Sequence, residues 1–113
     1  MNIKKYERNG FQVLNITEDL GIQSSLSDLK TIIANLMEKG IKRVAVMFTP
    51  NSYLSSESIS VLVQSLELMR ENGARLVIIR PGEQIGEALR ITGLTDMVDF
   101  VDSEAQLCAD TTA

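Results

Sequence analysis

The chain has 113 residues, 44% of them hydrophobic and 23% charged, a balance typical of one globular domain with a single hydrophobic core. Its formal net charge of −4 argues against nucleic acid as a partner, because binding phosphates requires a basic face. It contains no histidine and one cysteine, Cys108, which argues against histidine-based catalysis, thiolate metal sites and intramolecular disulfides.

The first half of the chain predicts a hairpin, a helix and a buried strand. Residues 2–7 read as a short strand, and 11–16 partly alternate apolar and polar side chains after Asn9-Gly10, a strong hairpin signal. Ser25-Leu26-Ser27-Asp28 matches a helix-capping pattern, and the apolar residues behind it recur at helical spacing until a glycine. The nearly continuous apolar run at 43–48 is typical of a strand covered on both faces.

The second half predicts helices that alternate with strands. A serine-rich segment, 54–62, opens an amphipathic helix that ends near Gly73. Beyond it, the pattern predicts in turn a buried strand, a short helix, a short strand and a final helix, over residues 75–80, 84–92, 97–101 and from Ser103. The polar residues 109–113 are expected to form a disordered tail.

The predicted order of elements is β-β-α-β-α-β-α-β-α, in one domain expected to span residues 1–108. Strands that alternate with helices imply crossover connections and a largely parallel sheet. The first hairpin adds an antiparallel pair to that sheet. We therefore expect an α/β fold with a mixed, mostly parallel sheet of about five strands.

The serine-rich segment is the strongest candidate site. It follows a buried strand and opens a helix, where unpaired backbone N–H groups and a partial positive charge favour a phosphate group. Three serines at this position, Ser55, Ser56 and Ser58, predict a site that phosphorylation could switch. The alternative is that Ser55 or Ser56 only caps the helix, since serine is a preferred cap. The residues alone leave both interpretations open.

Other residues with reactive side chains do not suggest catalysis. The acidic residues around Glu18-Asp19, Asp96 and Asp102 are interpreted as solvated loop and turn residues rather than an acid–base pair. The seven glycines are dispersed and form no glycine-rich phosphate loop. Cys108, near the end of a predicted helix, is interpreted as a small packing residue. We therefore predict no catalytic residue, no metal and no cofactor, and we do not expect an enzyme.

Apolar runs in this chain are too short to cross a membrane. The longest have about six residues, against roughly 18 for a spanning helix. The first six residues carry lysines with no apolar stretch behind them, unlike a signal peptide. We therefore expect a cytoplasmic protein that is not inserted in a membrane.

The chain resembles the STAS family, the sulphate-transporter and anti-sigma-factor-antagonist domain, across nearly its whole length. The resemblance rests on the order of elements, on the serine-rich segment after the third strand, and on Leu89-Arg90-Ile91-Thr92-Gly93-Leu94. This last run is similar to the family's Leu-x-x-x-Gly-Leu pattern between a helix and a strand. The resemblance implies one STAS-type domain with helices packed mainly on one face of the sheet.

The stand-alone bacterial members that this chain resembles are anti-sigma factor antagonists. In them, the serine after a motif aspartate is phosphorylated by an anti-sigma factor that is also a serine kinase of the ATPase fold. The unphosphorylated form binds that anti-sigma factor, and a PP2C-type phosphatase resets the switch. Position by position, the resemblance implies Ser56 as the phosphoacceptor, with Ser55 and Ser58 as fallback sites. The partner contacts it implies are at Ser55, Ser56, Glu57, Ser58, Ile59, Asp19 and Ile22.

The serine-rich segment departs from the family motif at four positions. Ser55 stands where the motif has Asp, and Glu57 where it has Ser, Thr or Ala. Ser58 and Ser60 replace glycines, which adds bulk where a partner could approach the backbone. These departures favour an alternative function, a scaffold STAS subunit of a larger signalling or transport assembly without a phosphoswitch. A nucleotide-binding STAS domain ranks last, because no phosphate loop or basic cradle is present.

Overall fold

The computed structural model describes residues 2–21 and 25–107. Ile22, Cys108 and the expected tail at 109–113 lie outside these residues. Within the described ranges, the order of strands and helices follows the prediction as far as the fifth strand. The expected α/β class with a five-stranded mixed sheet is confirmed.

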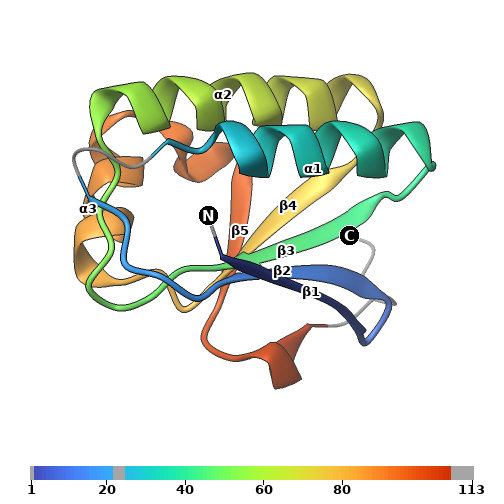
Figure 1. Cartoon of the computed structure of the whole chain (residues 1–113), viewed down its shortest axis with the longest axis horizontal. Coiled ribbons are helices and arrows are strands. Elements are labelled where there is room, and N and C mark those ends of the chain that lie inside the picture. The colour runs from blue at the N-terminus through green and yellow to red at the C-terminus, as the bar shows by residue number, and fades with distance from the viewer. Residues whose placement is uncertain (1, 22–24, 108–113) are drawn as a thin grey trace.

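Five strands form one sheet in the spatial order β1-β2-β3-β4-β5 (Figure 1). Their bounds are Ile3–Arg8 for β1, Phe11–Ile16 for β2, Arg43–Met47 for β3, Arg75–Ile79 for β4 and Val98–Val101 for β5. β1 pairs antiparallel with β2, and every other neighbouring pair is parallel. Asn9 and Gly10 form the two-residue hairpin loop, and both have positive φ angles, 53° and 86°. That backbone conformation explains the Asn-Gly pair, because these two residue types tolerate it best.

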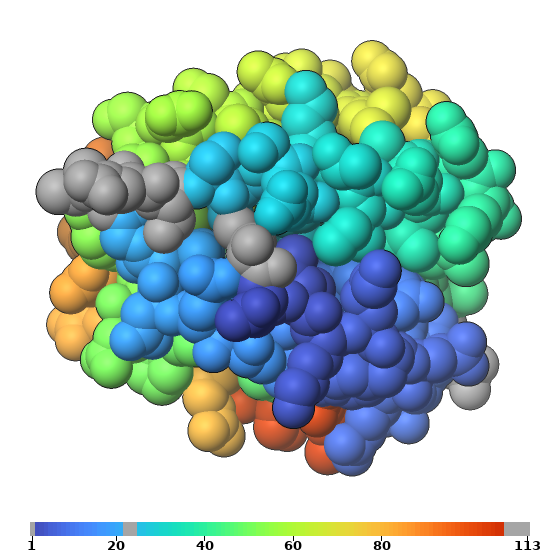
Figure 2. All heavy atoms as spheres, in the orientation of Figure 1, coloured from blue at the N-terminus to red at the C-terminus, as the bar shows by residue number. Residues whose placement is uncertain are grey.

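Helices α1 (Ser27–Glu38), α2 (Ser56–Glu71) and α3 (Glu83–Ile91) all cover the same face of the sheet (Figure 1). In the space-filling view, α1 and α2 lie side by side along the upper part of the molecule (Figure 2). Because the strands β2, β3 and β4 each lead into one of these helices, the carboxyl ends of the strands meet the helix starts at one edge of the domain.

Apolar side chains of the three helices and of the strands beneath them form the larger of two buried clusters. The buried helical members are Leu29, Ile33, Leu36 and Met37 on α1, Leu62, Leu66 and Met69 on α2, and Ile85 and Leu89 on α3. On each helix these positions recur mostly at three- and four-residue intervals, which places them on one stripe that faces the sheet.

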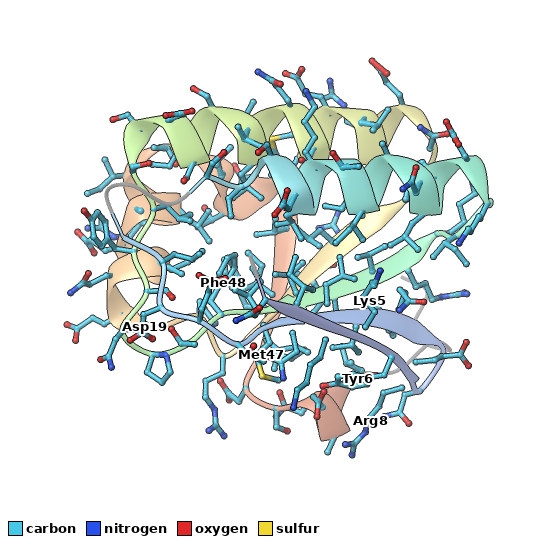
Figure 3. The ribbon with its side chains drawn as sticks, in the orientation of Figure 1. Lys5, Tyr6, Arg8, Asp19, Met47 and Phe48 are labelled. Atoms are coloured by element: carbon cyan, nitrogen blue, oxygen red, sulfur yellow. The ribbon has the colours of Figure 1, made fainter. Side chains whose placement is uncertain are left out.

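The opposite face of the sheet carries a second, smaller buried cluster. Its members are Phe11, Val13, Ala45, Val77, Ile79 and Leu107. Leu107 belongs to the segment after β5, residues 102–107, which we call the strap. The strap crosses under the sheet and is held at the β1–β2 hairpin, where Tyr6 donates a hydrogen bond to Glu104 and the Asn9 amide donates one to the Leu107 carbonyl at 3.0 Å (Figure 3).

The strap differs from the final helix that the sequence predicts from Ser103. Within the described residues it contains only a three-residue 3-10 turn, Glu104–Gln106. Leu107 then has an extended backbone, with φ −65° and ψ 129°, and its side chain is buried against the sheet. Tertiary contacts of Glu104 and Leu107 with the hairpin therefore prevail over the local helical signal at this point.

The start of α1 also differs from the expected capping pattern. The residue before the first helical turn is Leu26, and it makes no side-chain capping bond. Ser25 instead accepts a hydrogen bond from the Ser27 backbone nitrogen at 3.2 Å. Because Leu26 is fully buried, packing of its side chain sets where the helix begins. Among the described residues, no helix is both long and apolar enough to cross a membrane.

Candidate functional site

The start of α2 is capped by Ser55, as one of the two interpretations of the serine-rich segment predicts. Ser55 has an extended backbone, with φ −70° and ψ 166°, and its Oγ accepts a hydrogen bond from the Ser58 nitrogen at 3.2 Å. The two hydroxyls are also 3.2 Å apart, with Ser55 as donor. Ser55 therefore satisfies one of the free N–H groups at the helix start, which leaves the hydroxyl of Ser56 out of the capping interaction.

The serines of this segment differ sharply in exposure. Ser56 and Ser60 are exposed, whereas Ser58 is only 1% exposed and Ser55 is half-buried. Glu57 is exposed beside Ser56, and Ile59 is half-buried against the larger cluster. Of the three serines that the sequence points to, Ser56 is the most exposed, and its hydroxyl takes no part in the cap.

The loop before α2 is tied to the loop after β2 by a chain of side-chain hydrogen bonds. Thr49 donates from its Oγ1 to Asp19 Oδ1 at 2.5 Å. Since that hydroxyl has one hydrogen, the 2.6 Å contact between Thr49 and Ser52 requires Ser52 as the donor. Ser52 Oγ also accepts from the Leu20 nitrogen at 2.8 Å. This network places Asp19 beside the loop that leads to Ser56 (Figure 3).

A close backbone contact holds the same loop from the other side. A Cβ atom at Gly82, the residue before α3, would lie 2.7 Å from the carbonyl oxygen of Pro50. Real Cβ atoms do not approach a backbone oxygen so closely, so this position requires glycine. At the carboxyl edge of the sheet, hydrogen bonds thus join the loops after β2 and β3, and the loops after β3 and β4 pack closely against each other.

The segment around Ser56 is acidic. Residues 49–60 contain Glu57 and no lysine or arginine. Within this stretch, a phosphate on Ser56 would therefore be favoured only by the backbone N–H groups and the dipole at the helix start. Among the described residues, no three acidic, cysteine or histidine side chains are grouped so that they could hold a metal ion.

Two residues of this arrangement, Thr49 and Ser52, are not predicted from the sequence, where they only form part of a break between a strand and a helix. Their partners lie in a loop about 30 residues earlier, and neither loop has a periodic pattern that could reveal the contact. Ile22, which the family resemblance implies as a partner contact, lies outside the described residues.

The mixed five-stranded sheet, with its three helices on one face, defines a small α/β domain of a known family. The model of the STAS domain family matches residues 2–107, so the chain belongs to that family. An anti-sigma-B factor antagonist from Staphylococcus epidermidis is 24% identical over 98 residues, covering 87% of this chain and 90% of that protein. One from Staphylococcus aureus is 22% identical with the same coverage.

Solved structures show the same fold. A crystal structure of a Thermotoga maritima protein that is proposed to be an anti-sigma factor antagonist superposes with a TM-score of 0.77 and 18% sequence identity. The match covers 92% of this chain and 89% of that one. An NMR structure of the same protein superposes with a TM-score of 0.73 and 19% identity, and covers 90% and 82% of the two chains. The names of the two Staphylococcus relatives describe a regulatory role, that of an anti-sigma-B factor antagonist, and not an enzymatic one.

Proposed function

We propose that this protein is an anti-sigma factor antagonist whose binding is switched by phosphorylation of Ser56. In its unphosphorylated form it binds an anti-sigma factor that is also a serine kinase of the ATPase fold. Phosphorylation releases it, and a PP2C-type phosphatase restores the binding form. The single observation that carries this proposal is the exposure of Ser56 at the start of α2, beside a cap formed by a different serine.

Phosphoryl transfer to Ser56 requires no rearrangement of the helix start. Ser56 Oγ forms a bond to the γ-phosphorus of the ATP that the kinase holds, the bond to ADP breaks, and the hydroxyl proton passes to a base of the kinase. Because Ser55 keeps its bond to the Ser58 nitrogen, the cap survives the reaction. The helix start tolerates the new anion, so the domain stays folded.

The effect of the phosphate falls on the interface. It adds about −1.5 to −2 charges next to Glu57, in a segment without a lysine or arginine between residues 49 and 60. A kinase surface that fits the neutral hydroxyl then faces a concentrated negative charge that it must desolvate. An unpaired charge at an interface costs several kcal/mol, which changes occupancy by orders of magnitude.

Mass spectrometry of the protein purified from its native cells tests the site. We expect a phosphate on the peptide that contains Ser56, and its loss in the variant Ser56→Ala. Ser60→Ala is the matched control, because Ser60 is an exposed serine four residues further along the same helix. If no phosphate is found under several growth conditions, the scaffold function without a phosphoswitch is favoured instead.

Co-purification from the same cells tests the switch. We expect Ser56→Asp to weaken recovery of the partner at least about tenfold, equivalent to about 1.4 kcal/mol, while Ser60→Asp weakens it less. The partner is expected to be a protein with an ATPase-type kinase domain. Equal recovery with Ser56→Asp and with the unchanged protein would contradict the switch, whatever the partner proves to be.

A further inference from the structure

A cavity separate from the helix start lies between the strap and the carboxyl ends of β3 and β4. Its volume is about 310 Å³, at the small end of the range for small-molecule sites. Met47, Pro50 and Ile79 supply its apolar lining, and Phe48, whose side chain is buried in the larger cluster, also borders it. Figure 3 shows Met47 at the end of β3 on the side of the sheet that faces the strap, and Phe48 on the opposite, helix-covered side. Ser56 does not line this cavity.

The strap, which forms one side of the cavity, is held in place by contacts with β1. Glu104 accepts a hydrogen bond from Tyr6 and lies 3.5 Å from the guanidinium of Arg8. Leu107 is buried in the cluster on this face of the sheet. Glu104 lines the cavity but its carboxylate is already paired, and the cavity is therefore formed before any ligand arrives.

Arg80 stands at the rim of the cavity in an unfavourable backbone conformation. Its φ angle is 43°, in the left-handed region that residues other than glycine seldom adopt. Its backbone nitrogen donates to the Val101 carbonyl at 2.7 Å, and its Nε donates to the Asp102 carbonyl at 3.0 Å. These two bonds hold the guanidinium at the rim, and among the described residues no carboxylate pairs with it.

Asp102 supplies a negative charge at the same rim. Arg80 bonds to its backbone carbonyl and not to its carboxylate, so the cavity is lined by two opposite charges that do not form an ion pair with each other. Ser103 adds a hydroxyl to the lining. A ligand with a single charge would satisfy one of these groups and be repelled by the other. A head group that carries both charges satisfies both.

We propose that this cavity binds a small zwitterion with an apolar side chain, of the size and charge of an apolar α-amino acid. The ligand's carboxylate pairs with Arg80, its ammonium group pairs with Asp102, and its side chain packs on Met47 and Pro50, the two apolar lining residues with accessible surface. This site is independent of the proposed phosphoswitch, because none of these residues belongs to the start of α2.

NMR titration of the full chain tests the site with three probes that all carry a phenyl ring on a two-carbon chain and differ in their charged groups. L-Phenylalanine carries both charges, 3-phenylpropionate only the negative one, and 2-phenylethylamine only the positive one. We expect L-phenylalanine to give saturable shifts of backbone amide signals at residues 47–48, 79–80 and 102–104. We expect it to bind about tenfold more tightly than either single-charge probe.

Two variants assign the charges. Arg80→Gln keeps a side chain of similar size and should reduce L-phenylalanine binding to the level of 2-phenylethylamine, and Asp102→Asn should reduce it to the level of 3-phenylpropionate. Arg43→Gln is the control, because Arg43 is an exposed arginine at the opposite end of β3. Equal binding of 3-phenylpropionate and L-phenylalanine would overturn the proposed ligand class. Shifts elsewhere, or none up to the solubility of the probes, would overturn the site.

Discussion

Thr49 Oγ1 donates a hydrogen bond to Asp19 Oδ1 across 2.5 Å, and so joins the loop after β2 to the loop after β3. The contact matters because the second loop leads directly into Ser56. Ser52, which is fully buried, continues the same chain of hydrogen bonds to the Leu20 nitrogen. The position of the candidate phosphoacceptor is thus set in part by a side chain that no partner can reach.

Replacing Ser52 with alanine should destabilise the domain. The substitution leaves the Leu20 N–H without its acceptor in a buried place, which costs about 1–3 kcal/mol. Urea unfolding of Ser52→Ala measures the loss, with Ser60→Ala as the control because an exposed serine contributes within about 0.5 kcal/mol. Equal stability of the two variants would show that the network does not hold the loops together.

The Ser55 cap predicts a second change in stability. Ser55→Ala removes the acceptor for the Ser58 nitrogen and should lower the free energy of unfolding by about 0.5–2 kcal/mol. Ser55→Asp should retain most of the stability that the cap contributes, because a carboxylate also accepts a hydrogen bond from the Ser58 nitrogen and is favoured at a helix start. Thermal unfolding of the two variants compares them directly. If Ser55→Asp is as unstable as Ser55→Ala, the cap is not the source of the effect.

Most strands and helices can be predicted from the sequence because each has a periodic pattern or a turn signal of its own. Asn9-Gly10 marks the hairpin, and Ser55 marks the start of α2. Contacts between distant segments leave no such pattern. Tyr6 and Glu104 are 98 residues apart, and nothing near Ser103 indicates that the chain turns under the sheet instead of forming a helix. The loop network and the strap therefore become visible only in the folded chain.

Tyr6 should titrate at a higher pH than free tyrosine. Burial is the largest cause that raises the pKa of Tyr6, and the hydrogen bond to Glu104 raises this pKa further. The folded state favours the neutral phenol of Tyr6. The contribution of this phenol to the free energy of unfolding is therefore complete below the pKa of tyrosine in the unfolded chain. It is lost as the pH rises through the higher pKa of the folded protein. Absorbance titration in a Tyr53→Phe background, where Tyr6 is the sole tyrosine, measures this pKa.

Glu104→Gln provides the control for this titration. It removes the charge beside the phenol and should lower the pKa of Tyr6 only in part, because burial remains as the first cause. A pKa of Tyr6 at or below that of free tyrosine in the unchanged protein would contradict the contact between the strap and β1.

Two glycines of the same region should respond in opposite directions to the same substitution. Gly82→Ala places a Cβ atom 2.7 Å from the Pro50 carbonyl oxygen, so the loops must separate, at a cost of about 1–3 kcal/mol. Gly86 lies inside α3, where an added Cβ atom would have open space around it, and Gly86→Ala should stabilise the helix by about 0.5–1 kcal/mol. Urea unfolding of both variants gives the two signs. If Gly82→Ala is as stable as the unchanged protein, the loops after β3 and β4 are not in close contact. The loops at the start of α2 would then be held together only by the hydrogen bonds among Asp19, Thr49 and Ser52.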